Sequence, residues 1–428
     1  MKKIFTVVDM FCGAGGESTG IMQAAREKDL NVRLTAINHW ERAIETHAAN
    51  HPGAEHLCES IEHIDPVTVM NSERVNLLWA SPECTHHSVA RGGRPRSDQS
   101  RASAWMVLKW LSELYVERVI IENVPEFLSW GALNANGRPI PNQKGKIFHA
   151  FISALRSLGY VVDWRILRAA DYGDPTGRRR LFIQAAKGKK KILWPQITHM
   201  DGEGENFFGC KRWVAAREVI DWNLSGTSIF DRKRPLADNT LRRITSGIKK
   251  YWGNCAEPFL AVLYGSNDTR SIDLPFPTVT TSGAHHALIT PFITRYHGSH
   301  TGGTDGDKRN HSIEQPIPSL DTSNRYGIIK PFILPNEGYY RGNKAHGIDK
   351  PIGAVAASRG YGALITGGTG LKLDICFRML KPHELKLAQG FPADYKILGT
   401  AADQMKQIGN AVPVNTAKAL GKAILMGV

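Results

Sequence analysis

Residues 4–16, which read IFTVVDMFCGAGG, decide the fold of this chain. Their apolar beginning, 4–8, is typical of a buried strand, and the glycines that follow predict a tight turn into a helix over 17–29. Such a turn lets the backbone approach a nucleotide-like ligand, and the helix amino terminus offers free amides. Asp9 and Phe11 suit a nucleoside that is held by stacking. The third position of a G-x-G-x-x-G pattern is Ser18, which argues against a dinucleotide oxidoreductase.

Alternation of strands and helices continues beyond this turn. We expect strands at 33–37, 77–79, 119–121, 161–166 and 181–185, and helices at 41–50, 102–114 and 147–158. Near the carboxyl terminus, helices are expected from Lys381 to Gln389 and over 415–426. This order predicts an α/β fold with a mostly parallel, doubly wound sheet.

A repeat interrupts the alternation. The segment Ser271–Thr278 (SIDLPFPT) recurs 41 residues later as Ser312–Ser319 (SIEQPIPS), and more weakly as Gly347–Ala354. Units of this kind cannot bury their faces singly, so they are expected to stack into one β-rich module. We therefore predict a discontinuous domain of residues 1–186 and 371–428, with residues 187–370 inserted. A structural insertion without a contact role remains the alternative.

Length and composition narrow the class of protein. The 428 residues exceed what one hydrophobic core usually supports, so two domains are expected. The net charge of +14 favours a polyanionic partner such as nucleic acid, although a basic surface without a partner is also compatible with it. The six cysteines are scattered without a C-x-x-C pair, and no stretch is long and apolar enough to span a membrane. We expect a soluble, reduced, cytoplasmic protein without a metal.

Two side chains at the ends of apolar strands are candidates for chemistry. Cys84 follows the run 75–80 in the turn 81–85 (SPECT), where a thiol of lowered pKa can attack an electron-poor ring. Glu122 ends the run 119–121. A desolvated carboxyl there would have a raised pKa and could donate a proton to a ring nitrogen. The alternatives are an inert buried thiol and a capping or surface carboxylate.

Arginines form a third candidate group. Arg178 and Arg180 alternate before the strand 181–185, so they share a face and could clamp a base carbonyl or a phosphate. The alternative is a solvated basic edge.

Six blocks fall in one order: Asp9–Gly16, Pro82–Cys84, Glu122–Val124, Asp171–Arg180, Arg378–Pro392 and Gln407–Val414. In this order and spacing the chain resembles the DNA (cytosine-5) methyltransferases over about residues 4–186 and 371–425, and its repeats resemble recognition regions of phage and prophage members. The resemblance implies a Rossmann-like, S-adenosylmethionine-dependent methyltransferase sheet with an inserted β-rich target-recognition domain. It also implies double-stranded DNA as partner, a monomer, and a possible cognate restriction endonuclease without direct contact.

The resemblance also implies roles for particular residues. Cys84 would attack carbon 6 of a flipped cytosine, Glu122 would protonate ring nitrogen 3, and Arg178 and Arg180 would orient the base, with residues 88–96 closing over it. S-adenosylmethionine would be held by Asp9, Phe11, Gly13, Ala14, Gly15, Gly16, His39, Trp40, Ser60, Ile61, Asn410 and Val412.

The chain departs from the family pattern at several positions. Glu83 and Thr85 replace the proline and glutamine that usually flank the cysteine. His39 and Ser60 replace the acids that usually bind ribose and adenine, and Thr176 replaces a glutamine. The departures at Glu83, His39 and Ser60 motivate one alternative, a catalytically silent DNA-binding protein. Because one branch of the family acts on RNA, an RNA cytosine-5 methyltransferase is a second alternative.

Overall fold

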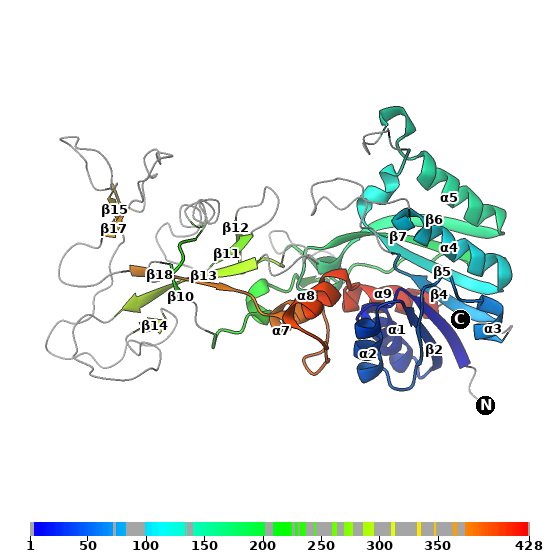
Figure 1. The fold of residues 1–428 in the computed structure, drawn as a ribbon, viewed down its shortest axis with the longest axis horizontal. Coiled ribbons are helices and arrows are strands. Elements are labelled where there is room, and N and C mark those ends of the chain that lie inside the picture. Colours follow the sequence, from blue (N-terminus) through cyan, green and yellow to red (C-terminus); the bar gives the residue numbers. More distant parts are fainter. Residues whose placement is uncertain are drawn as a thin grey trace. The chain divides into compact units, whose positions relative to one another are not determined.

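The computed structural model describes most of the chain in two compact units. The described residues are 4–71, 74–82, 99–132, 134, 140–201, 209–224, 227–229, 232–236, 244, 259–262, 269–276, 286–294, 310–312, 332–334, 346–347, 363–365 and 373–426. The first unit comprises residues 1–220, 273–284 and 381–428, and the second comprises 221–272 and 285–380 (Figure 1). The assignment of residues 187–370 to target recognition stays a prediction.

A seven-stranded sheet forms the centre of the first unit. Its strands, in spatial order, are β3 (Glu55–Cys58), β2 (Asn31–Asn38), β1 (Ile4–Met10), β4 (Val75–Ala80), β5 (Val116–Asn123), β7 (Arg179–Lys187) and β6 (Tyr160–Arg168). The pairs from β3 to β5 are parallel, and β7 runs antiparallel to both of its neighbours. The predicted α/β fold with a mostly parallel, doubly wound sheet is confirmed.

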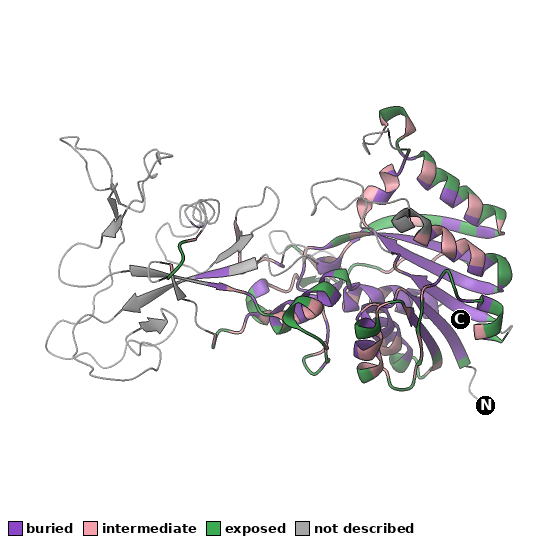
Figure 2. Cartoon of the chain, in the orientation of Figure 1, coloured by how far each residue is buried: buried purple, intermediate pink, exposed green. Residues whose placement is uncertain are grey.

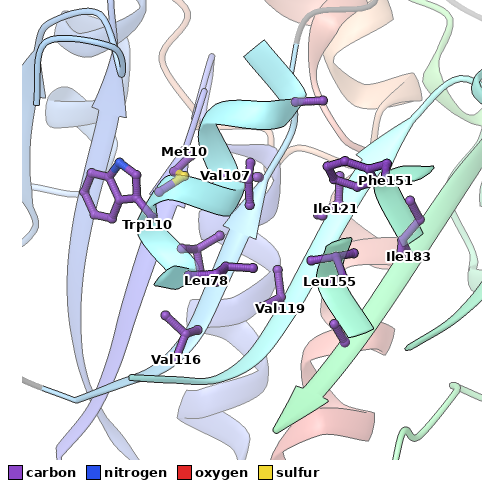
Figure 3. Packing of buried hydrophobic residues seen from close by; sticks show 14 of the residues in the cluster. Met10, Leu78, Val107, Trp110, Val116, Val119, Ile121, Phe151, Leu155 and Ile183 are labelled. Atoms are coloured by element: carbon purple, nitrogen blue, oxygen red, sulfur yellow. The ribbon is translucent and has the colours of Figure 1, made fainter. Parts of the chain in front are cut away.

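Helices cover both faces of this sheet. On one face, α4 (Gln99–Glu113) and α5 (Lys146–Ser157) pack onto the strands; Figure 3 shows Val107 and Trp110 of α4 with Leu78 of β4 in this cluster. The other face is covered by α1 (Gly16–Glu27) and α9 (Val414–Leu425). The strands between the two layers are almost entirely buried (Figure 2). Burial on both faces explains why β4 and β5 contain the apolar runs 77–80 and 119–121.

The close approach of α1 and α9 depends on small residues. A Cβ atom at Gly20 would lie 2.6 Å from the Ala417 Cβ atom and 2.7 Å from the Val414 carbonyl oxygen. The carboxyl-terminal helix is thereby anchored on the first helix of the chain.

The remaining elements of the first unit are short. They are the helices α2 (Glu41–Asn50), α3 (Pro66–Met70), α7 (Pro382–Ala388) and α8 (Ala401–Asn410), the 3₁₀ turns Pro125–Ser129, Pro141–Gln143, Ala169–Tyr172 and Ala216–Val219, and the strands β8 (His199–Met200) and β9 (Lys211–Arg212). The bounds predicted for α2 are those observed, whereas β3, α3 and α8 were not predicted from the sequence.

The second unit is rich in β-structure, as expected. An antiparallel sheet joins β10 (Thr227–Ser228), β18 (Leu373–Met379), β13 (His286–Thr294), β11 (Phe259–Val262), β12 (Thr269–Ser271) and β14 (Asn310–Ser312). A smaller sheet joins β16 (His346–Gly347), β15 (Phe332–Leu334) and β17 (Ala363–Ile365). Most of the second and third repeat copies, 313–319 and 348–354, lies outside the described residues.

Candidate active site

Three of the predicted segments meet at the carboxyl edge of the parallel strands. β1 leads into the glycine turn, β4 into Ser81 and Pro82, and β5 ends in Glu122 and Asn123. The Ser81 amide donates to the Met10 carbonyl at 3.1 Å, and the Asn123 side chain donates to the Pro82 carbonyl at 3.4 Å. These bonds fix the backbone at Ser81 and Pro82, directly before the segment that contains Cys84. Cys84 itself lies outside the described residues, together with the rest of 83–98.

The glycine turn has the left-handed backbone that its composition predicts. Phe11, Gly13 and Gly15 have φ values of 62°, 49° and 82°. A Cβ atom at Gly16 would overlap the Val412 carbonyl, so this turn and the segment before α9 are in direct contact. At Gly13 a Cβ atom would meet, among the described residues, only the Phe11 carbonyl oxygen, at 3.8 Å. The turn therefore has an open side at Gly13 and a packed side at Gly16.

Two buried carboxyls lie beside the turn. Asp9 accepts a hydrogen bond from Ser18 through Oδ2, whereas its Oδ1 has no hydrogen-bond partner among the described residues. Burial raises the pKa of Asp9 to about 7. Burial also raises the pKa of Glu17 well above its ordinary value, and the neighbouring Asp9 carboxyl adds to this effect. Glu17 was missed from the sequence because an acid in the first turn of a helix is usually a solvated partner of the helix dipole.

Histidine side chains form hydrogen-bonding contacts around the glycine turn. The buried His47 contacts Ser18 Oγ through Nε2 at 3.0 Å and His56 Nε2 through Nδ1 at 2.9 Å. His51 Nε2 lies 3.4 Å from the Tyr395 hydroxyl, which donates to the Ala14 carbonyl at 2.5 Å.

Glu122 and Arg180 form an ion pair at the site. The Arg180 Nε atom lies 3.1 Å from Glu122 Oε1, and both side chains are largely buried. They come from adjacent antiparallel strands, on which Glu122 is opposite Phe182. Burial raises the pKa of Glu122, while the cations of Arg180 and Arg178 oppose this shift. The desolvated carboxyl predicted from the sequence is therefore present.

Arg178 has a structural contact as well. Its guanidinium is buried, and Nη1 donates to the Gly409 carbonyl at 2.9 Å. The chain around it is held by Asp174, whose carboxylate accepts the amides of Asn415 and Thr416, both at 2.9 Å, and the Thr416 hydroxyl at 2.8 Å. Burial raises the pKa of Asp174 to about 7. The hydrogen bonds of Asp174 with Asn415 and Thr416 join residues more than 240 positions apart, so they have no local signal in the sequence.

The other residues predicted to bind the cofactor differ in how far they are exposed. His39 is exposed, and Trp40 has the Lys406 ammonium 4.1 Å from its ring centroid. The Ser60 amide donates to the Glu59 carboxylate at 2.8 Å, and the Ile61 side chain packs into the core. Asn410 is exposed at the end of α8.

Among the described residues, no helix is long and apolar enough to cross a membrane, and no cluster of three or more metal-ligating side chains occurs.

The sequence profile of a family described as C-5 cytosine-specific DNA methylase matches residues 5–214 and 365–426. The chain belongs to this family. Members of the C-5 cytosine-specific DNA methylase family are also found among its curated relatives. It is 30% identical over 202 residues to the type II methyltransferase M.AgeI of Thalassovita gelatinovora, covering 46% of this chain and 43% of that one. It is 23% identical to DNA (cytosine-5)-methyltransferase 1A of Oryza sativa subsp. japonica, covering 99% of this chain and 28% of that one. The chain thus spans less than half the length of these relatives.

Solved structures support the fold. A methyltransferase of Entamoeba histolytica superposes with a TM-score of 0.53 at 14% identity, covering 99% of each chain. A prophage-encoded DNA modification methyltransferase of E. coli gives the same TM-score at 16% identity and the same coverage of both chains. This chain of the C-5 cytosine-specific DNA methylase family therefore has the methyltransferase fold predicted from its sequence.

Proposed function

We propose that this protein transfers a methyl group from S-adenosylmethionine to carbon 5 of a flipped cytosine in a specific DNA sequence. The observation that carries the proposal is the Glu122–Arg180 pair at the edge where β4 leads toward Cys84. A buried acid of raised pKa, a fixed cation and a thiol are the groups that this reaction requires.

The glycine turn fits the proposed cofactor. Its open side at Gly13 admits close approach of a ligand, and the buried, unpaired Oδ1 of Asp9 is a hydrogen-bond acceptor that a ligand would satisfy. Among the described residues, none forms a hydrogen bond with this Asp9 oxygen. S-adenosylmethionine, when bound there, supplies an electrophilic methyl group. Phe11, Asp9 and the backbone of Gly13–Gly16 would hold it, and Trp40 would contact its adenine.

The chain's own residues activate the cytosine. The Cys84 thiolate forms a bond to carbon 6, and the electron pair of the ring double bond shifts to carbon 5. Glu122 donates its proton to nitrogen 3, which disperses the charge of the ring, and Arg180 and Arg178 stabilise the resulting carboxylate. After carbon 5 has gained the methyl group, its proton passes to water. Nitrogen 3 then returns its proton to the Glu122 carboxylate, the double bond between carbons 5 and 6 re-forms, and the thiolate leaves carbon 6.

The experiment follows labelled methyl transfer from S-adenosylmethionine to duplex DNA. Cys84→Ser is expected to lower transfer by at least about a thousandfold, because the hydroxyl is a much weaker nucleophile. Cys58→Ser is the matched control, since Cys58 is an exposed thiol on β3. Equal transfer by wild type and Cys84→Ser would overturn the assignment.

A second measurement separates the proposal from its alternatives. DNA containing 5-fluorocytosine is expected to trap a covalent complex at Cys84, because carbon 5 then cannot lose a proton. A catalytically silent DNA-binding protein would bind DNA with steep salt dependence and form no such complex. An RNA methyltransferase would prefer tRNA to duplex DNA in competition.

A further inference from the structure

A cavity of about 540 Å³ lies at the end of the sheet opposite the glycine turn. Tyr115, which precedes β5, and Lys187, which ends β7, belong to its wall. The same strand, β5, carries Glu122 at its other end. The residues that line the cavity are Tyr115, Arg118, Lys187, Gly188, Lys189, Lys190, Lys191 and Leu193. The cavity is therefore separate from the proposed active site.

The charge of this cavity is strongly one-sided. Five of its eight lining residues are lysine or arginine, and none is acidic. The nearby Glu117 carboxylate is already neutralised, because it lies 3.0 Å from Lys190 Nζ and also pairs with Arg74. A cavity with this excess of cations attracts an anion.

The basic segment is fixed in place. Arg118 is 4% exposed, and its Nη1 donates to the Lys191 carbonyl at 2.7 Å. The Gln184 side chain donates to the Leu193 carbonyl at 2.9 Å, so both sides of the turn are tied to the sheet. The Arg118 Nε atom, although buried, has no hydrogen-bond partner within the described part of the chain. The Arg118 side chain lines the cavity, where an anion would accept hydrogen bonds from its guanidinium.

Tyr115 indicates the class of anion. Its side chain is 47% exposed, but the Arg74 guanidinium lies 4.7 Å and the Lys187 ammonium 5.3 Å from its ring centroid. Lys187 also lies 5.1 Å from the ring centroid of Tyr160. These cation–π contacts position the cations, and they occupy the ring that a nucleobase would stack on. The site therefore suits a phosphate group rather than a base.

We propose that Arg118 and the segment Lys187–Lys191 form a binding site for a phosphate-bearing anion, independent of methyl transfer. The phosphate would belong either to a free nucleotide or to a nucleic-acid backbone. In both cases Arg118 provides directed donors and the lysines provide the surrounding positive charge.

The test titrates the full chain with inorganic pyrophosphate by calorimetry at fixed ionic strength. The pocket variant Lys189→Gln with Lys191→Gln is expected to bind at least about tenfold more weakly than wild type. The control variant Lys28→Gln with Lys396→Gln removes the same charge from exposed positions elsewhere and is expected to bind within twofold of wild type. Arg118→Lys, which keeps the charge and loses the fork of donors, is expected to weaken binding severalfold. Equal binding by the pocket and control variants, or no binding by wild type, overturns the proposal. The kcat of methyl transfer by the pocket variant at saturating DNA is expected to be unchanged.

Two further probes distinguish the sources of phosphate. If the site takes a free nucleotide, ADP competes with pyrophosphate, and binding of a duplex containing only A·T pairs keeps its salt dependence in the pocket variant. If it takes a nucleic-acid backbone, the slope of log K against log salt for this duplex falls by about two in the pocket variant. Either outcome supports the proposal, and the absence of both contradicts it.

Discussion

The Arg180 Nε atom lies 3.1 Å from Oε1 of Glu122, across the only antiparallel pairing that β5 makes in the described sheet. Burial and charge act on this carboxyl in opposite directions. Removal from water disfavours the carboxylate, whereas the guanidinium favours it, and the pKa of Glu122 remains above its ordinary value. Glu122 therefore holds its proton more readily than an exposed glutamate does.

Replacement of Glu122 by glutamine tests its role as a proton donor. The amide preserves shape and hydrogen bonding but cannot transfer a proton, so we expect methyl transfer to fall by about 10² to 10⁴. Single-turnover transfer measures the effect, and Glu113→Gln, an exposed carboxylate on α4, is the control. Activity of Glu122→Gln equal to that of the control would exclude a proton-transfer role.

Arg180 is expected to set the pH at which Glu122 loses its proton. The protonated acid is the active form, so the rate should decline as pH rises through the pKa of Glu122. Arg180→Met removes the largest charge effect that lowers the pKa of Glu122, so the decline should move to higher pH. Comparison of kcat/KM profiles for wild type and Arg180→Met measures the shift. A displacement toward lower pH, or none, would be incompatible with this coupling.

Gly20 is expected to be indispensable for the packing of α1 on α9. Gly20→Ala places a methyl group 2.6 Å from both Ala417 Cβ and the Lys418 amide nitrogen, and overpacking of this kind costs about 1–3 kcal/mol. Gly53→Ala is the matched control, because no atom lies within 4 Å of its Cβ position. It should leave stability unchanged or raise it by about 0.4–1 kcal/mol. Urea unfolding of the full chain gives both values, and equal midpoints for the two variants would refute the packing argument.

Much of this architecture was predictable from short-range patterns. The buried strands β1, β4 and β5 contain apolar runs, and the glycines after β1 predicted a tight turn, whose backbone proves to be left-handed. The half-exposed β3 lacks such a run. The helix α8 begins with a capping box, in which Thr400 and Asp403 exchange hydrogen bonds, and this local signal would have allowed it to be predicted.

The site was predictable only in part, for a physical reason. Glu122 and Arg180 stand at the ends of recognisable strands, and strand ends share an edge of the sheet. The capping of α9 by Asp174 and the burial of Glu17 depend on contacts between distant segments. Such contacts leave no periodic signal in the sequence, so only the folded chain reveals them.

The buried histidines behind the glycine turn predict a loss of stability in acid. Burial lowers the pKa of His51 to about 4, with the neighbouring His56 and Arg26 adding to the shift, and burial also lowers the pKa of His47. In the unfolded chain each imidazole would take up a proton near pH 6.5. The unfolded state therefore binds more protons than the folded state between about pH 6.5 and 4, so the free energy of unfolding falls as the pH falls through this window.

His51→Gln removes one of these titrations, so its stability should depend less steeply on pH than that of wild type. Between pH 6.5 and 5 the two slopes should differ by up to one proton, or about 1–2 kcal/mol in total. At pH 8 both proteins are uncharged at this position, and their difference there isolates the lost contacts with Thr19 and Tyr395. Urea unfolding at pH 8, 6.5 and 5 supplies the comparison. If the curves of free energy against pH run parallel, His51 does not stay neutral in the folded chain, and the acid sensitivity has another origin.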